Sequence, residues 1–360
     1  MVVFLVSEIL KIKSHKGEYF VKFNKEGIAE LNNSPIANAV FIIDKNIAEL
    51  YKSKIQNVLD TKRVILIEAI EENKSLEKFP AYIEELTKLK IRREQPLVAI
   101  GGGIIQDITC FIAATLMRGL PWIFYPTTLL AQSDSCIGSK SSINSGDIKN
   151  ILGTFTPPNH VIIDVTFLNT LKKSEINSGI GEMLKVHAID SPSSFNLIQE
   201  SYDQMQNDAN VLENFIFNSL LMKRKLIEID EFDVGPRNVM NYGHSFGHAI
   251  ETATNYRIPH GIAVTIGMDM ANFVSVELGI SNIHNFERMH STLVKNYDDF
   301  RKVPINFRSL LKALAKDKKN SSTQLRLILP DKDGNIMIGL YDNDLNLENA
   351  IKKYLEKYIG

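Results

Sequence analysis

Short apolar runs alternate with helical patterns through the first half of the chain. The apolar runs cover residues 39–44, 62–67, 96–100, 122–125 and 160–164. Between them, residues 76–89 have helical periodicity with charges on one face, and residues 107–117 form a second helical segment. Short apolar runs of this kind are typical of strands buried on both faces of a parallel sheet. The alternation therefore predicts an α/β fold in which helices cover both faces of a parallel sheet.

The pattern changes after about residue 170. Residues 172–297 are mostly helical in pattern and contain few β-branched runs. Beyond them the sequence predicts one strand at 324–329, a turn at 331–334 and an amphipathic helix that begins near Leu345. A chain of 360 residues is also too long for one small core. We therefore expect an α/β domain over residues 1–170 and a mainly helical domain over residues 171–360.

Composition argues against several classes of partner. The formal net charge is −1, which argues against a general nucleic-acid or membrane-surface binder, so any anion site is local. No apolar run approaches the ~20 residues that span a bilayer. The first 20 residues predict a β-strand rather than a signal peptide, because they lack a basic start and a cleavage site. The two cysteines, Cys110 and Cys136, make no disulfide framework, which indicates a cytoplasmic protein.

A glycine-rich loop, GGGIIQD at residues 101–107, lies between a predicted strand and a predicted helix. Glycines let backbone amides approach phosphate oxygens, and the helix N-terminus adds a favourable dipole. The loop is not the G-x-G-x-x-G fingerprint, so a simple tight turn is an alternative. Asp44 ends an earlier strand, where a carboxylate can hold a ribose hydroxyl. Further polar residues that follow strands at this edge are Glu71, Lys74, Thr127 and Thr128. Together these features favour a dinucleotide site.

The second half carries a candidate metal site. His244 and His248 are one helical turn apart, and His260 follows just after a proline. Glu182 and Lys185 share one face of an otherwise apolar helix, where they form either a buried ion pair or part of a metal site. Glu182, His244 and His260 together match the three-ligand pattern of catalytic zinc, and the same ligands suit cobalt.

Cationic side chains accompany this candidate site. The polar stretch 132–144 contains Asp134 and Lys140, and it is either a solvated loop or part of a cleft. The other basic or amide residues of this set are Lys149, Asn150, Lys223, Arg237, Lys318 and Lys319. Several Lys and Arg side chains around a metal imply a substrate with phosphate and carboxylate groups.

From about Ile42 to Leu329, the chain resembles the 3-dehydroquinate synthase family of sugar-phosphate cyclases. The matching segments, in order, are ENKSLE, GGGIIQD, AATLMRG, PTTLLAQSDS, IGSKSSIN, KNILGTF, GIGEMLK, IDEFDVGPR, NYGHSFGHAIE, HGIAV and DKK. The resemblance implies an N-terminal Rossmann-like domain, a C-terminal mainly helical metal-binding domain, an active site in the cleft between them, and a homodimer.

The resemblance also implies a reaction. In the family, NAD accepts hydride from a ring hydroxyl of a seven-carbon sugar phosphate acid, 3-deoxy-arabino-heptulosonate 7-phosphate. The ketone acidifies the neighbouring C–H, phosphate leaves by β-elimination, and NADH returns the hydride. Ring opening and an intramolecular aldol step then give 3-dehydroquinate. Zinc serves to polarise the hydroxyl and the transient ketone.

Roles for individual residues follow from the same resemblance. The metal ligands are Glu182, His244 and His260, whereas His248 matches a proton-transfer residue, which corrects the simple interpretation of the histidine pair. Asp233 and Lys185 join His248 as catalytic residues. The substrate-binding residues are Arg118 (across the dimer), Asp134, Lys140, Asn150, Lys223, Arg237 (to the carboxylate), Asn241 and one lysine of DKK, taken as Lys319. The NAD-binding residues are Asp44, Glu71, Lys74, Gly102, Gly103, Asp107, Thr127, Thr128 and Lys149.

The chain departs from the family pattern at several positions. Glycines that are usual in the family are replaced here by Gln106, Cys110, Ser139 and Ser142. Asp233 stands where a glutamate is usual. Ile262 replaces a glutamate two residues after the third histidine, which removes a charge near the metal.

These departures leave alternatives open. The first is a related cyclase that acts on another substrate, such as sedoheptulose 7-phosphate. The others are a metal-dependent NAD(P) alcohol dehydrogenase and an NAD-binding pseudoenzyme. Arg237 and Asn241 favour a substrate that carries a carboxylate, and the cluster of cations and metal ligands argues against the last two alternatives.

Overall fold

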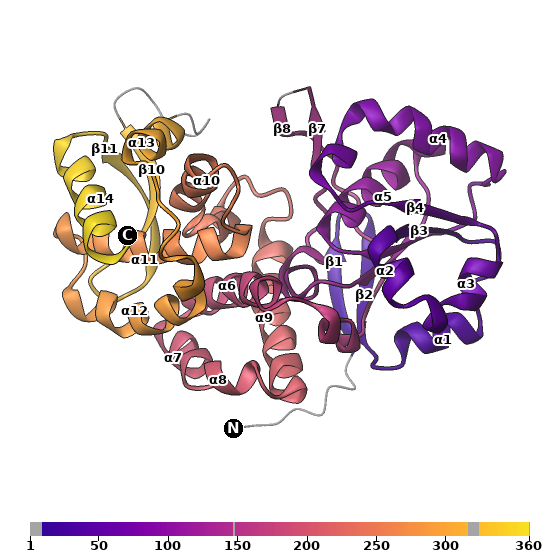
Figure 1. Cartoon of the computed structure of the whole chain (residues 1–360), viewed down its shortest axis with the longest axis horizontal. Coiled ribbons are helices and arrows are strands. Elements are labelled where there is room, and N and C mark those ends of the chain that lie inside the picture. The colour runs from indigo at the N-terminus through magenta and orange to yellow at the C-terminus, as the bar shows by residue number, and fades with distance from the viewer. Residues whose placement is uncertain (1–8, 147, 316–323, 360) are drawn as a thin grey trace. The chain divides into compact units, whose positions relative to one another are not determined.

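The structure is a computed structural model that describes residues 9–146, 148–315 and 324–359. Its contacts divide the chain into two compact units. Unit 1 contains Met1–Leu171 together with Arg224–Phe232, and unit 2 contains Lys172–Lys223 and Asp233–Gly360. In Figure 1, the strands of unit 1 run from indigo to magenta, and unit 2 contains the orange and yellow helices. None of the helices in the described ranges is both long enough and apolar enough to cross a bilayer.

Unit 1 is built on a seven-stranded sheet in the order β1-β2-β9-β6-β5-β3-β4. The strands are β1 Ile9–Ser14, β2 Gly17–Phe23, β3 Val40–Asp44, β4 Val64–Ile67, β5 Leu97–Gly101, β6 Trp122–Pro126 and β9 His160–Ile163. All neighbours pair parallel except β1 and β2, which form an antiparallel hairpin. The predicted α/β fold with a parallel sheet is therefore confirmed. The prediction of a single N-terminal strand is wrong, because a turn at residues 15–16 divides the described part of that segment into two strands.

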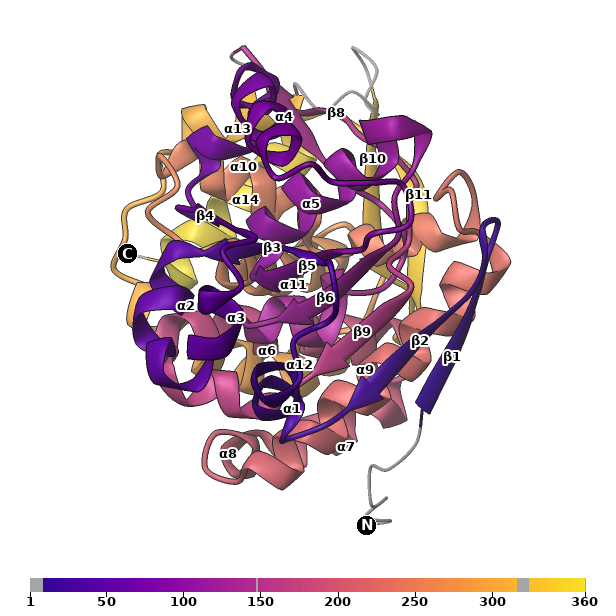
Figure 2. The ribbon, with the colours of Figure 1, turned by 90° about the vertical axis from the view of Figure 1, so that its right-hand side faces the viewer.

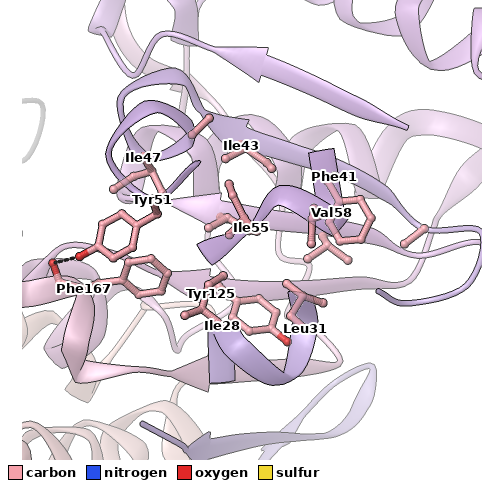
Figure 3. Close-up of a cluster of buried hydrophobic side chains, with 14 residues drawn as sticks. Ile28, Leu31, Phe41, Ile43, Ile47, Tyr51, Ile55, Val58, Tyr125 and Phe167 are labelled. Carbon is pink, nitrogen blue, oxygen red and sulfur yellow. Dashed lines mark hydrogen bonds between the residues drawn. The ribbon is translucent and has the colours of Figure 1, made fainter. Parts of the chain in front are cut away.

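Helices cover both faces of this sheet, as the alternating pattern predicts. They are α1 Gly27–Asn33, α2 Lys45–Leu50, α3 Gln56–Asp60, α4 Phe79–Lys88 and α5 Gly103–Thr115. Figure 2 shows α4 and α5 on one face and α1, α2 and α3 on the other. The central strands β3 and β5 are apolar along their length because both of their faces are buried. Figure 3 shows the core on the α1–α3 face, where Phe41 and Ile43 of β3 meet Ile28, Ile55 and Phe167.

Helix α5 begins four residues before the predicted start at Asp107. Gly102 lies just before the helix, and Gly103 is its first residue. The glycine-rich loop therefore forms the first turn of α5, where free backbone N–H groups gather. The helix ends at Thr115, and Met117 and Arg118 that follow have φ angles of 52° and 64°. This left-handed pair cannot continue the helix, so the predicted end at Met117 is two residues too late.

Strand β1 is an edge strand, and residues from late in the chain bind its backbone. Arg224 Nη1 donates to the Lys11 carbonyl at 3.4 Å, and the Lys13 amide donates to Glu228 Oε1 at 3.1 Å. These residues belong to α9, Ala209–Ile229, whose last turns are part of unit 1. Side chains that satisfy an edge strand protect it from pairing with another chain.

Unit 2 is mainly helical. Its helices are α6 Lys173–Asp190, α7 Pro192–Glu200, α8 Tyr202–Met205, the first part of α9, α10 His244–Ala253, α11 His260–Glu277, α12 Ile283–Tyr297, α13 Phe307–Ala315 and α14 Leu345–Tyr358. Helix α11 is buried along residues 261–275, as expected of a helix that is apolar all round. Asp269 is a buried carboxylate in the middle of α11. It accepts hydrogen bonds from the hydroxyls of Tyr297 and Tyr354 at 2.7 and 2.8 Å. These bonds join α12 and α14 to the central helix.

The C-terminal part contains two strands rather than the one that was predicted. Strand β10, Gln324–Pro330, pairs antiparallel with β11, Ile336–Asp342. The predicted turn at residues 331–334 connects them, and Gly334 there has a φ angle of 83°. Strand β11 was missed because Gly339 interrupts its apolar alternation and much of the strand is exposed.

His187 of α6 makes the stability of unit 2 depend on pH. Burial lowers the pKa of His187 to about 4, and its Nδ1 lies 2.9 Å from the Ser194 hydroxyl. The unfolded chain takes up a proton here near pH 6.5, so the folded state loses stability as the pH falls from 6.5 towards 4. We expect a loss of roughly 2 kcal/mol between pH 7 and pH 5 from this group. Urea unfolding of the wild type and of His187→Gln checks this, because the variant should lose less stability over the same range; equal losses would contradict it.

Candidate functional site

Glycines bring three helices of unit 2 into close contact. A Cβ on Gly261 of α11 would lie 1.9 Å from the Ser178 carbonyl O of α6, and a Cβ on Gly181 would lie 2.2 Å from the Gly261 carbonyl O. A Cβ on Gly267 of α11 would lie 2.1 Å from the carbonyl O of Gly243, which precedes α10. Only glycine permits such backbone approaches. The start of α11 therefore lies next to the middle of α6, and the start of α10 lies against α11.

Glu182 of α6 meets two imidazoles at this crossing. Its Oε1 lies 3.7 Å from His244 Nε2 and 3.4 Å from His260 Nε2, and its Oε2 accepts a short hydrogen bond from Lys185. Glu182 and Lys185 are almost completely buried. Glu182 therefore forms the ion pair with Lys185 and also approaches the two histidines.

Burial and neighbouring charges set the protonation of this cluster. Burial alone would raise the pKa of Glu182, but the Lys185 ammonium and the imidazoles hold it well below its usual range. Burial and the Lys185 charge hold the pKa of His244 well below its usual range. Burial alone would lower the pKa of His260, but the carboxylates of Glu182 and Glu251 raise it to about 10. At neutral pH the cluster therefore has an anionic carboxylate, a neutral His244 and a protonated His260.

This set of donors fits a divalent metal ion. Glu182 Oε1 is buried, lacks a hydrogen bond among the described residues, and faces two imidazole nitrogens. One carboxylate oxygen and two imidazole nitrogens suit zinc or cobalt and leave coordination positions open. A metal would replace the proton on His260, so binding would release a proton.

His248 lies beside this cluster and is more exposed. The ring centroid of His248 lies 5.3 Å from that of His244 and 5.7 Å from that of His260. One nitrogen of each of the three histidines lies within 4.8 Å of the others, so distance alone does not exclude His248 as a ligand. A pocket on this side is lined by Asn238, Asn241, His244, Ser245, His248, Arg326 and Ile328. This pocket places Asn241, which is predicted to bind substrate, beside His244 and His248.

Among the remaining predicted residues of unit 2, Arg237 lies in η7, a 3-10 helix over Pro236–Asn241, and Lys223 lies in α9. Arg237 and Lys223 are buried, and both make polar interactions within the described structure. Asp233 precedes η7 with a φ angle of 56°, a strained conformation that is common at functional sites. Lys318 and Lys319 lie outside the described residues.

A second polar cluster forms in unit 1 around Lys74. Its Nζ lies 2.9 Å from Asn150 Oδ1, 3.2 Å from Asp107 Oδ2 and 3.5 Å from Glu71 Oε1. Asp107 also accepts from the Ser142 amide at 3.0 Å. Burial raises the pKa of Asp107 to about 6, although Lys74 opposes the shift. The structure thus brings together three predicted NAD residues and one predicted substrate residue.

Most of the other predicted NAD residues lie at the carboxyl ends of the central strands. Asp44 ends β3 and accepts from the Asn46 amide at 3.0 Å, so it caps α2. Gly102 and Thr128 follow β5 and β6, and a Cβ on Gly102 would lie 2.9 Å from the Thr128 side chain. Thr127 donates its amide to the Gly101 carbonyl at 3.0 Å. The chain order reverses between β3 and β5, and ligands of open α/β sheets bind at such a point.

The polar stretch 132–144 is not a solvated loop. Its start belongs to a π-helix over Ala131–Ser135, and residues 136–139 are buried. Gln106 of α5 fixes this turn, because its Nε2 donates to the Ser135 carbonyl and its Oε1 accepts from the Ser135 hydroxyl, both at 2.6 Å. Asp134 lies in the π-helix, and such turns are frequent at functional sites. Gln106, which stands where the family usually has glycine, therefore fixes the turn that contains Asp134, a predicted substrate residue.

Three predicted cations of unit 1 are exposed. Lys140 precedes a small hairpin formed by β7, Ile143–Ser145, and β8, Ile148–Leu152, and Lys149 lies within β8. Arg118 follows the far end of α5, a helix of 13 residues that begins at Gly103. At 1.5 Å per residue, α5 is about 20 Å long, and Arg118 lies beyond the end opposite Gly103. The structure therefore places Arg118 beyond the opposite end of α5 from Gly102 and Gly103.

Sequence reasoning missed four residues near the histidines. Asn238, Ser245 and Arg326 line the pocket, and Glu251 lies 3.3 Å from His260 Nδ1. Glu251 follows His248 by three residues and His244 by seven, so helical spacing could have placed it on the same face. Arg326 gave no such signal, because it comes from β10, far away in the sequence.

Comparison with known proteins gives a consistent family. Sequence models described as 3-dehydroquinate synthase N-terminal and C-terminal match residues 64–178 and 179–320. The 3-dehydroquinate synthase of Campylobacter concisus is 33% identical over 356 residues, which cover 96% of this chain and 98% of the relative. That of Dictyoglomus thermophilum is 37% identical over 292 residues, or 81% of each chain.

Solved structures with a similar fold include two synthases and a glycerol dehydrogenase. A 2-deoxy-scyllo-inosose synthase complexed with carbaglucose-6-phosphate, NAD⁺ and Co²⁺ has a TM-score of 0.83 at 22% identity, and covers 96% of this chain and 100% of its own. A 2-epi-5-epi-valiolone synthase from Streptomyces hygroscopicus with NAD⁺ and Zn²⁺ has a TM-score of 0.81 at 23% identity, and covers 94% and 97%. Glycerol dehydrogenase from Schizosaccharomyces pombe has a TM-score of 0.61 at 17% identity, and covers 94% and 90%.

Proposed function

Because the chain belongs to the 3-dehydroquinate synthase family, we propose that it converts 3-deoxy-arabino-heptulosonate 7-phosphate to 3-dehydroquinate and phosphate. It is thus an enzyme of the carbon–oxygen lyase type, with NAD and zinc or cobalt as cofactors. The observation that carries the proposal is the buried Glu182 Oε1, which faces two imidazole nitrogens in a chain whose family match extends over residues 64–320.

Glu182, His244 and His260 are the proposed metal ligands. A bound zinc or cobalt ion supplies Lewis-acid polarisation of a substrate oxygen. Lys185 holds Glu182 ionised and oriented through its hydrogen bond to Oε2. His248 lines the pocket beside these ligands, which supports the proposal that it exchanges protons with the substrate. Asp233 and Lys185 complete the proposed catalytic set.

NAD binds, in this proposal, at the carboxyl ends of β3, β5 and β6. It supplies reversible hydride acceptance, so the net redox change is zero. Gly102 and Gly103 let the backbone approach the diphosphate at the start of α5, and Asp44 accepts from a ribose hydroxyl. The other proposed contacts are Glu71, Lys74, Asp107, Thr127, Thr128 and Lys149. Lys74 is held by Asp107 and Asn150, so the dinucleotide and substrate contacts share one network.

The test is phosphate release from 3-deoxy-arabino-heptulosonate 7-phosphate with catalytic NAD and added zinc. We expect stoichiometric 3-dehydroquinate without net NADH. A folded, metal-loaded and NAD-binding sample that releases no phosphate would overturn the proposed substrate. Sedoheptulose 7-phosphate is then the next substrate to test, and net NADH formation would indicate a dehydrogenase instead.

Arg237 is the proposed contact for the substrate carboxylate. It is buried in η7, so a carboxylate that loses this partner leaves a desolvated charge without compensation. We expect Arg237→Ala to raise KM by about 10- to 100-fold, because hydrogen bonds to charged groups contribute about 1.5–3 kcal/mol. Steady-state kinetics check this, and unchanged KM would contradict the role. The other proposed substrate contacts are Asp134, Lys140, Asn150, Lys223, Asn241 and Lys319.

Arg118 is proposed to complete the site of a second subunit in a homodimer. Its place beyond the far end of α5 supports this, because α5 is about 20 Å long and Gly102 and Gly103 lie at its other end. Mixing inactive Arg118→Ala with inactive His244→Ala should restore part of the turnover through hybrid dimers. Failure to restore turnover, or full turnover in a monomer, would contradict the proposal.

A cytoplasmic location is proposed from the two buried, free cysteines.

A further inference from the structure

Each imidazole that faces Glu182 is held by a second partner on its other ring nitrogen. His244 Nδ1 lies 3.2 Å from the carbonyl O of Tyr242, and His260 Nδ1 lies 3.3 Å from both carboxylate oxygens of Glu251. The two Nε2 atoms consequently face the same Glu182 oxygen. We infer that Glu251 is a positioning residue of the metal centre, which sets the ring orientation and the Nδ1 proton of His260. This inference rests on the proposed metal site.

Glu251 is well placed for this role on α10. It follows His244 and His248 on one face of the helix, so the same element presents one proposed ligand and the support for another. The Glu251 side chain is 13% exposed, whereas that of His260 is 37% exposed. A mostly buried carboxylate competes less with water for its partner, so its contact with His260 holds the ring more firmly than a surface contact does.

The contact between Glu251 and His260 also bears on Ile262, where the chain departs from the family pattern. Ile262 is completely buried in α11, and the sequence predicted that its replacement of a glutamate removes a charge near the third histidine. The structure shows a carboxylate beside His260 that comes from the neighbouring helix α10 instead. The charge near this histidine is therefore supplied by Glu251.

The physical consequence concerns the affinity for metal. A neutral imidazole binds a metal through one nitrogen only when its proton is on the other. A carboxylate that accepts this proton fixes the tautomer and makes the metal-binding nitrogen more basic. Loss of such a partner typically lowers metal affinity by about 10- to 100-fold. Glutamine keeps an accepting oxygen but no charge, so Glu251→Gln should lose less affinity than Glu251→Ala.

The experiment measures zinc affinity by competition with a chromogenic chelator, using the full chain without substrate. The variants are Glu251→Ala, Glu251→Gln and the control Glu287→Gln, which breaks an exposed Glu–His pair of 3.7 Å with His284 on α12. We expect affinity to fall by about 10- to 100-fold in Glu251→Ala, less in Glu251→Gln, and not at all in the control. The visible spectrum of the cobalt-loaded protein should change in the same order, which a general loss of stability would not produce.

Equal zinc affinity and identical cobalt spectra in wild type and Glu251→Ala would overturn the inference and leave the proposed function intact. A wild type that binds neither metal would overturn the metal site and this inference together. Phosphate release by the wild type separates the two failures, because it tests the proposed function without any Glu251 variant. If Glu251→Ala does not fold, the comparison of Glu251→Gln with the control still decides the matter.

Discussion

His244→Ala is expected to remove the bound metal and most of the turnover. His244 Nε2 is one of two imidazole nitrogens that face Glu182 Oε1, and burial keeps this imidazole neutral and able to bind a cation. A Lewis acid contributes several kcal/mol to the stabilisation of developing charge. Its loss corresponds to a fall in turnover of roughly 10³-fold or more. Metal analysis of the purified variant, together with phosphate release, checks both parts.

Two matched histidine variants sharpen this test. His248→Ala should keep its metal and lose turnover, because His248 is proposed to transfer protons although it lies within 4.8 Å of the other histidine nitrogens. His284→Ala removes an exposed imidazole on α12 and should change neither property. Full metal occupancy in His244→Ala would contradict the proposed ligand set. Loss of metal in His248→Ala would instead make His248 a ligand.

Gly261→Ala is expected to destabilise unit 2 and to weaken metal binding at the same time. The added Cβ would lie 1.9 Å from the Ser178 carbonyl O, so helices α6 and α11 have to separate. The obstacle is backbone, which no side-chain rotation relieves, and overpacking of this kind costs about 1–3 kcal/mol or more. The separation moves His260, at the first turn of α11, away from Glu182 on α6. Thermal unfolding and zinc competition measure the two effects.

The control for this substitution is Gly103→Ala at the first residue of α5. Nothing lies within 4 Å of a Cβ at Gly103, and its φ angle is not in the left-handed region, so the thermal midpoint should not fall. A wild-type midpoint and wild-type zinc affinity in Gly261→Ala would show that the close helix contact does not position the ligands.

The parallel sheet could be predicted because its central strands carry their own signal. Strands β3, β5 and β6 are continuous apolar runs, since both faces of the sheet are covered, and their bounds lie within one residue of those predicted. The start of α5 could not be predicted in the same way. Glycines have low helix propensity, so the sequence of the glycine-rich loop does not indicate that the first turn of the helix begins there.

Elements that depend on contacts outside their own segment were harder to predict. Strand β11 is partly exposed, and it exists because β10 pairs with it. The end of α9 belongs to unit 1 because Arg224 and Glu228 bind the backbone of an edge strand that begins more than 200 residues earlier. Neither interaction leaves a periodic pattern in the local sequence.

The sequence by itself determined the α/β alternation, the helical second half and the family of the chain. These depend on apolar periodicity and on motif spacing, which are local properties. Only the tertiary structure decided that Glu182 Oε1 faces two Nε2 atoms, that Glu251 holds His260, and that Arg326 enters the pocket. A helix crossing sets the approach of Glu182 to His260, and this crossing depends on which backbones can approach at glycines such as Gly181 and Gly261. That approach is a property of two packed surfaces, so no single segment of sequence contains it.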